Sequence, residues 1–153
     1  MKALVVYYSR TGITQNLAEN IAKNLNADMD EIKDKKSRSG LFGWFGAGKD
    51  AVLKKETEIE YDADPENYDV VIIGSPVWAG NITPAVRTYL NKFTFQKVAF
   101  FATYGGSEGK VFENLEKYSS RPLDKIGIKM KDVKLANMKQ KVERFCKNIK
   151  EHF

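Results

Sequence analysis

Hydroxyl side chains gather where an apolar stretch near the N-terminus ends. The run VVYYSRTGIT places Ser9, Thr11 and Thr14 around Gly12, and apolar residues at four-residue spacing then predict a helix over residues 13–25. A helix N-terminus leaves backbone amides unpaired and carries a partial positive charge, which favours an anion. The cluster therefore indicates a phosphate site. The alternative is that one hydroxyl simply caps the helix.

The residue types missing from this loop restrict the phosphate it could bind. The loop lacks the Gly-x-Gly-x-x-Gly turn of a dinucleotide site, the lysine of a triphosphate site and the cysteine of a phosphatase. Capture of a single terminal phosphate fits best. Residues 43–49 match the spacing of a nucleotide P-loop, but Asp50 stands where Ser or Thr is required, so we interpret that match as chance.

Two further loops combine flat aromatic side chains with glycine and proline. Residues 74–84 read GSPVWAGNITP and contain Trp78, and residues 103–109 read TYGGSEG and contain Tyr104. A planar ring system lying between these side chains would explain both, with the glycines letting backbone amides approach its edge. The alternatives are that Trp78 closes the top of the core and that the Gly-Gly pair is only a turn.

The elements that must position these loops alternate along the chain. Strands are expected over Ala3–Tyr8, Asp28–Lys33, Val70–Ser75, Val98–Tyr104 and Ile126–Val133. The first, third and fourth are almost continuously apolar, as strands covered on both faces must be, so we place them at the centre of a parallel sheet and the other two at its edges. Apolar residues at helical spacing predict four helices. Their apolar stripes begin at Ile13, after Pro84, at Val111 and at Leu135, and the last stripe runs to Ile149.

This alternation predicts an α/β fold with a three-layer, doubly wound, five-stranded parallel sheet in a single domain over residues 1–153. Ligands of such folds bind beyond the carboxyl ends of the strands, near the point where the strand order reverses. The three loops described above each follow a predicted central strand. They are therefore expected to meet at one end of the sheet.

Charge is unevenly distributed along the chain, whose formal net charge is +5. Residues 56–69 contain seven acidic and no basic residues, and residues 121–150 contain ten basic and three acidic ones. Solvated surfaces explain such runs, and attraction of an acidic partner, an anionic membrane or nucleic acid is the functional alternative. No nucleic-acid module accompanies the charge, so no nucleic-acid partner is expected. Membrane association is not expected either.

Few residues offer nucleophilic or metal-binding chemistry. The single cysteine, Cys146, lies beside the apolar stripe of the last expected helix, where a packed or half-exposed side chain is expected rather than a nucleophile. The only histidine, His152, is next to the C-terminus and is given no catalytic role. No catalytic residue and no metal site are proposed. No signal peptide or membrane span is recognised, and a cytoplasmic location is expected.

The three loops together resemble the flavodoxin family. YYSRTGITQNLAENIA resembles the family's signature for the phosphate of flavin mononucleotide (FMN), and VVIIGSPVWAGNITPAVRTYL and VAFFATYGGSEG resemble its second and third regions. The resemblance covers almost the whole chain and implies FMN as the cofactor and a strand order of 2-1-3-4-5. Only residues 119–135 separate the last two expected helices, which is similar to the short-chain members of the family.

The resemblance also implies which residues contact FMN. The phosphate would be bound by Ser9, Thr11, Gly12 and Thr14, with backbone groups of Arg10 and Ile13. The isoalloxazine ring and ribityl chain would contact Pro76, Val77, Trp78, Ala79 and Gly80, with Gly80 nearest the reactive N5 nitrogen and Asn81 at that edge. The other side and the pyrimidine edge would be lined by Thr103, Tyr104, Gly105 and Gly106.

The implied function is an electron carrier that passes electrons between redox partner proteins, as a monomer or a weak homodimer. An FMN-dependent NAD(P)H:quinone reductase or a flavin-dependent oxidase on the same fold is the alternative. The family's carriers are usually acidic, whereas this chain is basic, so the identity of its partners does not carry over. The aromatic segment Leu41–Phe45, within residues 39–52, also departs from the family, and either core packing or a docking patch would explain it.

Overall fold

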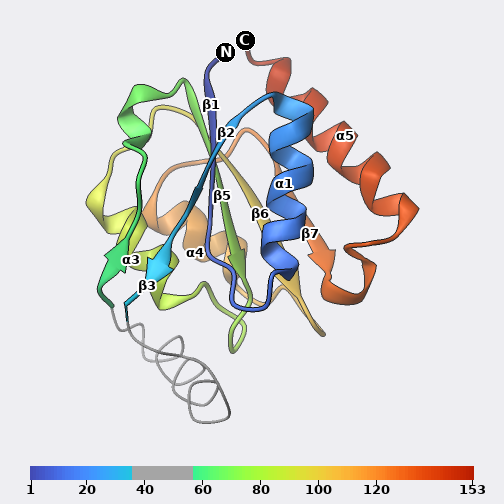
Figure 1. Cartoon of the computed structure of the whole chain (residues 1–153), viewed down its shortest axis with the longest axis horizontal. Coiled ribbons are helices and arrows are strands. Elements are labelled where there is room, and N and C mark those ends of the chain that lie inside the picture. The colour runs from blue at the N-terminus through green and yellow to red at the C-terminus, as the bar shows by residue number, and fades with distance from the viewer. Residues whose placement is uncertain (36–56) are drawn as a thin grey trace.

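The computed structural model describes residues 1–35 and 57–153. The aromatic segment at 41–45 and the P-loop match at 43–49 lie outside these residues. The five-stranded sheet contains β1 (Ala3–Tyr7), β2 (Asp28–Glu31), β5 (Val70–Pro76), β6 (Val98–Tyr104) and β7 (Lys125–Lys129) (Figure 1). Its strands are all parallel, in the order β2-β1-β5-β6-β7. Counting only these five strands, this is the predicted order 2-1-3-4-5.

The central strands are buried along their whole length apart from the last residue of β6. Every residue of β1 and β5 is buried, as is every residue of β6 before Tyr104. Such strands are covered on both faces, which accounts for their nearly continuous apolar sequences. The predicted central and edge positions are therefore confirmed.

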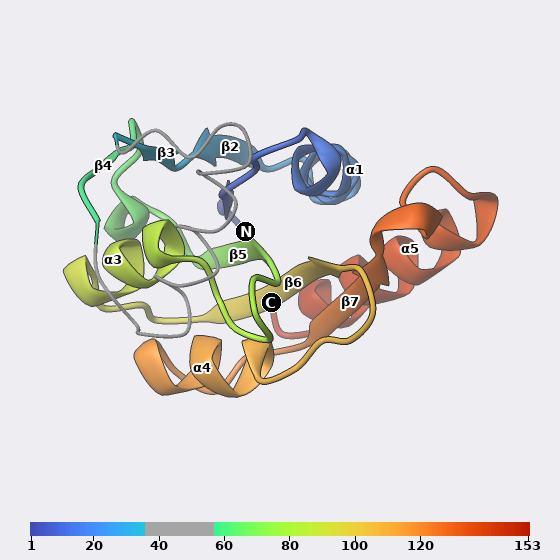
Figure 2. The same ribbon diagram turned by 90° about the horizontal axis from the view of Figure 1, so that it is seen from below.

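Helices cover both faces of the sheet (Figure 2). Two apolar clusters fill the spaces beneath them. The helices are α1 (Ile13–Leu25), α3 (Pro84–Lys92), α4 (Val111–Tyr118) and α5 (Ala136–Lys150). One cluster joins α1 and α5 to alternate residues of the strands, and the other joins α3 and α4 to the residues between them. The three-layer, doubly wound prediction is confirmed.

Short elements complete the β2 edge of the sheet. A two-stranded antiparallel sheet joins β3 (Lys33–Asp34) to β4 (Ile59–Glu60), and a 3-10 turn, η1, spans Pro65–Asn67. The buried carboxylate of Asp30 in β2 accepts hydrogen bonds from the backbone amides of Asp62 (3.1 Å) and Ala63 (2.8 Å). The acidic segment is thereby fixed along the β2 edge.

Two sequence predictions near the C-terminus need correction. The last strand was expected over Ile126–Val133, but β7 ends at Lys129 and a second 3-10 turn, η2 (Met130–Asp132), follows. Leu135 was expected to begin the apolar stripe of the last helix, but it is 48% exposed just before α5. The stripe begins instead at the buried Met138, because the chain must first turn from the sheet edge onto the helix layer.

The cysteine is a core residue, as predicted. Cys146 is 2% exposed, with its Sγ atom 3.9 Å from the carbonyl oxygen of Ile21, where α5 packs on α1. Burial raises the pKa of this thiol to about 12, and the nearby Lys150 lowers it only in part. The thiol is therefore protonated at neutral pH and is a poor nucleophile.

No helix of the described part of the chain is both long enough and apolar enough to cross a membrane.

Candidate functional site

Hydrogen bonds join the three predicted loops at the carboxyl ends of β1, β5 and β6. The hydroxyls of Thr14 and Thr103 are 2.8 Å apart, linking the first loop to the third. The amide of Val77 donates to the carbonyl oxygen of Thr103 (2.9 Å), and the amide of Lys110 donates to that of Gly80 (2.7 Å). The structure thus brings together three segments that are widely separated in the sequence, at the end of the sheet where ligands of this fold class bind.

The first loop forms a nest of amides at the start of α1. Gly12 is the residue before the helix, with a φ of 87° that side chains other than glycine rarely adopt. The Oγ atom of Ser9 accepts hydrogen bonds from the amides of Gly12 (3.1 Å) and Gln15 (3.3 Å). The amides of Ile13 and Thr14 lie in the same first turn, where helix geometry provides no acceptor. They are suitably placed for an anion.

The three hydroxyls of this loop differ in their surroundings. Ser9 is half-buried and engaged at the helix start, Thr11 is exposed, and Thr14 is only 2% exposed. The buried pair of Thr14 and Thr103 holds two hydroxyl protons but uses one of them for its mutual hydrogen bond. The pair therefore retains one hydroxyl proton that this bond does not use. Arg10, between Ser9 and Thr11, has a half-buried side chain.

The second loop is a tight turn with Ala79 and Gly80 at its tip. Both residues have positive φ angles, 50° and 72° respectively. The backbone groups of Trp78 and Asn81 exchange two hydrogen bonds of 3.0 Å across the turn. This is the pattern of a type I′ turn, in which alanine is strained and glycine is not. The side-chain oxygen of Asn81 accepts from the amide of Ile82 (2.8 Å), so that part of the side chain stabilises the turn.

The indole of Trp78 does not form an open stacking surface. It is 4% exposed and packs with the apolar cluster beneath α3 and α4. Its ring meets that of Tyr8 edge to face, with centroids 5.4 Å apart and an interplanar angle of 87°. This is the core-closing arrangement given above as the alternative. Trp78 therefore contributes to the site by fixing the turn that follows it.

The third loop is open at its two glycines. Tyr104 is half-buried, and Gly105 and Gly106 are exposed, with no described heavy atom within 4 Å of the position a Cβ atom would take. Among the predicted residues of the second loop, Pro76 is buried and Val77 is half-buried. Tyr104 is thus the aromatic side chain more accessible to a ligand.

The glycine that joins the second and third loops, Gly109, is not among the predicted site residues. Gly109 has a φ of 54°, and a Cβ atom there would lie 2.5 Å from the Cα and carbonyl oxygen of Gly80. Glycine is therefore required for this close approach. The available sequence signal was a glycine two residues before the apolar start of a helix. Its contact with Gly80 joins positions 29 residues apart, so it could be recognised only in the tertiary structure.

Residues 2–151 match the family model described as Flavodoxin. The chain belongs to the flavodoxin family.

Known proteins similar to this flavodoxin include both curated and solved examples. A flavodoxin-like domain-containing protein, BilS, from Clostridioides difficile is 32% identical over 109 residues, which are 71% of this chain. The chain spans about half the length of that relative (49%). A Lactobacillus acidophilus flavoprotein, solved in complex with FMN, is 26% identical, with a TM-score of 0.70 and coverage of 82% of this chain and 92% of that one.

The fold is also shared with more distant flavodoxins. Oxidised flavodoxin 2 from Bacillus cereus has a TM-score of 0.64, 19% identity and full coverage of both chains. At that identity the likeness concerns the fold alone.

Proposed function

We propose that this flavodoxin binds FMN non-covalently between its three loops and carries electrons between partner proteins. The observation that supports the proposal most directly is the bonded arrangement of the loops, in which an amide nest faces the same end of the sheet as Tyr104. The similar Lactobacillus acidophilus flavoprotein was solved with FMN, which supports the same cofactor here.

The donors of the first loop fit a terminal phosphate. The amides of Ile13 and Thr14, the exposed Thr11 hydroxyl and the hydroxyl proton retained by the Thr14–Thr103 pair are all neutral donors at a helix N-terminus. Charge-assisted hydrogen bonds from such groups bind a phosphate without requiring a lysine. Ser9 would keep the nest in shape through its bonds to Gly12 and Gln15.

The other two loops fit the ring of a flavin. The open space at Gly105 and Gly106 lets a planar edge approach the backbone, and Tyr104 offers an aromatic face. Bound FMN would supply the one-electron and two-electron chemistry itself. The residues of the chain would bind and orient the ring, and the bond from Lys110 to the Gly80 carbonyl would hold the second loop against the third.

A titration of the purified protein with FMN tests the proposal. We expect FMN fluorescence to be quenched on binding and the bound flavin to be reducible by dithionite. Thr11→Val should weaken binding by about tenfold or more, since a hydrogen bond to a charged group contributes about 1.5–3 kcal/mol. Thr94→Val, at an exposed position between α3 and β6, is the matched control and should bind like the parent protein.

Two results would contradict the proposal. If the purified protein does not bind FMN, the proposed cofactor is wrong. Steady NADPH oxidation with a quinone and no added reductase would replace the carrier function with the quinone reductase alternative.

A further inference from the structure

The fold separates the charges of this flavodoxin onto opposite edges of the sheet. The acidic segment containing β4 and η1 lies along β2, where Asp28 also accepts a 2.8 Å hydrogen bond from the hydroxyl of Tyr68. The basic segment forms β7, η2 and α5 at the other edge, so the two lie on opposite sides of the molecule (Figure 1). The net charge of +5 thus understates how basic the β7 edge is.

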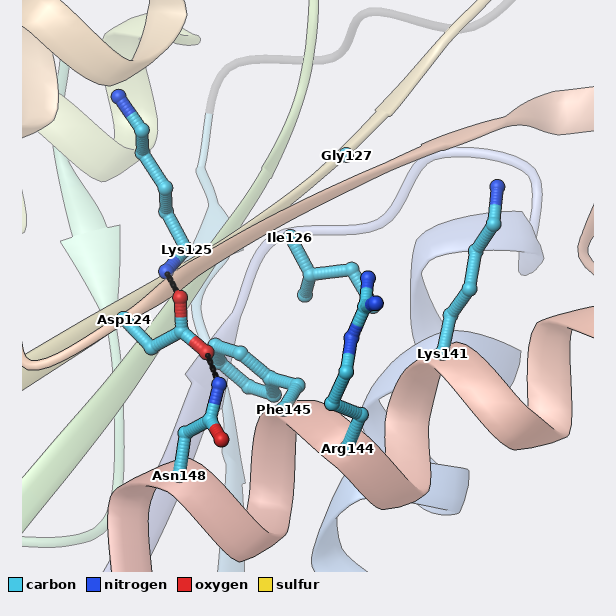
Figure 3. A pocket seen from close by; sticks show the side chains of 8 residues that line it. All are labelled: Asp124, Lys125, Ile126, Gly127, Lys141, Arg144, Phe145 and Asn148. Atoms are coloured by element: carbon cyan, nitrogen blue, oxygen red, sulfur yellow. Dashed lines mark hydrogen bonds between the residues drawn. The ribbon is translucent and has the colours of Figure 1, made fainter.

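Two adjoining cavities follow this basic edge between β7 and α5. The larger, of about 510 Å³, is lined by Lys125 of β7 and by Lys141 and Arg144 of α5 (Figure 3). The smaller, of about 260 Å³, is lined by Lys129, Lys141 and Tyr104. Gly127 and Lys141 line both cavities. We call the two together the β7–α5 groove.

The cations of the β7–α5 groove are not neutralised by nearby carboxylates. Within residues 1–35 and 57–153, none of Lys129, Lys131, Lys141 and Arg144 forms an ion pair within 4.0 Å, and all four are exposed. The side chain of Lys125 points away from α5 (Figure 3), with its Nζ atom 5.5 Å from the ring centre of Phe112 in α4, so its charge lies outside the groove.

Three carboxylates lie in or beside the groove, and two of them have other contacts. Asp124 accepts from the amide of Lys125 and from the side chain of Asn148, both at 2.8 Å (Figure 3). Asp132 lines the smaller cavity. The Glu108 side chain lies against Gly127, where it would block a Cβ atom. The charges of Lys129, Lys131, Lys141 and Arg144 outnumber these three carboxylates, so the groove attracts acidic side chains.

The groove begins at the rim of the proposed FMN site. Tyr104 ends β6, belongs to the third loop of that site and also lines the smaller cavity. A partner seated in the groove is therefore in contact with the residue that we place beside the flavin. Among the described strands, β7 pairs only with β6, which leaves its other edge without a strand partner in that part of the chain.

We propose that the β7–α5 groove docks an acidic segment of the redox protein with which this flavodoxin exchanges electrons. This inference rests on the proposed carrier function and names the chemistry of the partner. A concave groove receives protruding carboxylate side chains, whereas a flat anionic bilayer does not enter it. The acidic β2 edge would repel the same partner, so only one orientation of approach is favoured.

A labelled peptide titration tests the groove. A decaglutamate peptide is added to the ¹⁵N-labelled, FMN-loaded protein at low salt, and amide chemical shifts are followed. We expect shifts concentrated in β7, η2 and α5, with a shift of the Tyr104 amide, and no comparable binding of decalysine. Lys129→Glu with Lys141→Glu should weaken peptide binding by about tenfold or more, because both attractions become repulsions.

A matched variant controls for net charge. Lys23→Glu with Lys92→Glu changes two exposed lysines at the ends of α1 and α3 and alters the net charge equally. This variant should retain most of the peptide affinity. The alternative is that the lysines of the β7 edge serve only to prevent edge-to-edge aggregation of the sheet. Glutamates would serve that purpose equally well, so the groove variant would then bind the peptide like the control variant. That result would overturn the proposal.

Other outcomes also decide against the groove as a protein-docking site. Shifts spread over all surface lysines would overturn it. So would tighter binding of phosphatidylserine vesicles or duplex DNA than of the peptide, if that binding is lost in the groove variant. FMN affinity is measured in the same samples, because loss of FMN binding with intact peptide binding would contradict only the proposed carrier function.

Discussion

At the scale of single residues, the hydroxyls of the first loop have separate tasks. Ser9 organises the helix start, Thr11 faces solvent, and Thr14 is buried against Thr103. A cluster that looks uniform in the sequence therefore combines hydroxyls engaged in structural hydrogen bonds with one that is exposed. The distinction is measurable, because a buried hydroxyl affects the free energy of unfolding and an exposed one does not.

The Thr14–Thr103 pair should stabilise the fold before any ligand binds. Thr14→Val leaves the fully buried hydroxyl of Thr103 without its partner, and we expect the free energy of unfolding to fall by about 1–3 kcal/mol. The double variant with Thr103→Val should recover most of that loss, since no polar atom is then left unpaired. Urea unfolding of the FMN-free protein measures both.

Thr11→Val is the control for this pair. It should change the free energy of unfolding by less than about 0.5 kcal/mol, as expected for an exposed position. An unfolding midpoint of Thr14→Val equal to that of the parent protein would show that the 2.8 Å contact contributes nothing to stability.

At the scale of the elements, the site depends on contacts between loops that follow different strands. The turn after β5 and the loop before α4 meet backbone to backbone at Gly80 and Gly109, next to the bond from Lys110 to the Gly80 carbonyl. Parallel strands alone would bring the loops near one another. The absence of side chains at this crossing allows them to touch.

Replacing the glycine at the crossing should separate the two loops. In Gly109→Ala, the new Cβ atom would lie 2.5 Å from backbone atoms of Gly80, at a φ of 54° that disfavours alanine. We expect a loss of at least about 2 kcal/mol in the free energy of unfolding, and weaker FMN binding. Thermal unfolding and flavin titration provide the measurements.

Gly105→Ala serves as the comparison, because no described heavy atom lies within 4 Å of its Cβ position. Its stability should stay close to that of the parent protein. Equal stability of the two alanine variants would show that the close approach between the loops is not required.

At the scale of the whole molecule, the strand order of the sheet places the acidic and the basic segments of the sequence at opposite edges. The acidic segment is fixed to β2 through Asp30, and the basic segment forms β7, at the opposite edge of the five-stranded sheet. The proposed FMN site lies at one end of the sheet, and Tyr104 connects it to the basic edge. The electrostatic potential around the site should therefore be positive on the β7 side.

Electron transfer to small ions should report this potential. We expect the reoxidation of the dithionite-reduced protein by ferricyanide, an anion, to become slower as salt is raised, because screening removes the attraction. Reoxidation by hexaammineruthenium(III), a cation, should become faster. Stopped-flow absorbance measures both rates, and the same salt response with both acceptors would contradict a positive potential.

Much of the fold could be predicted from the sequence. The apolar runs of β1, β5 and β6 indicate strands covered on both faces, and the helical stripes indicate what covers them, because burial on each face sets the pattern of side chains. The boundaries at Lys129 and Leu135 could not be predicted, since the chain leaves the sheet edge there for reasons of packing between elements.

The sequence by itself determined the strand and helix pattern, the positions of the three loops and the hydroxyl cluster from which a phosphate site is predicted in the first. Only the tertiary structure decided which of these residues are buried in contacts with distant segments and which remain exposed. Burial of Trp78 against Tyr8, pairing of Thr14 with Thr103 and the crossing at Gly109 are contacts between segments remote in the chain. Local patterns reflect which face of an element is buried, but they carry no information on which distant atom lies beside a given side chain.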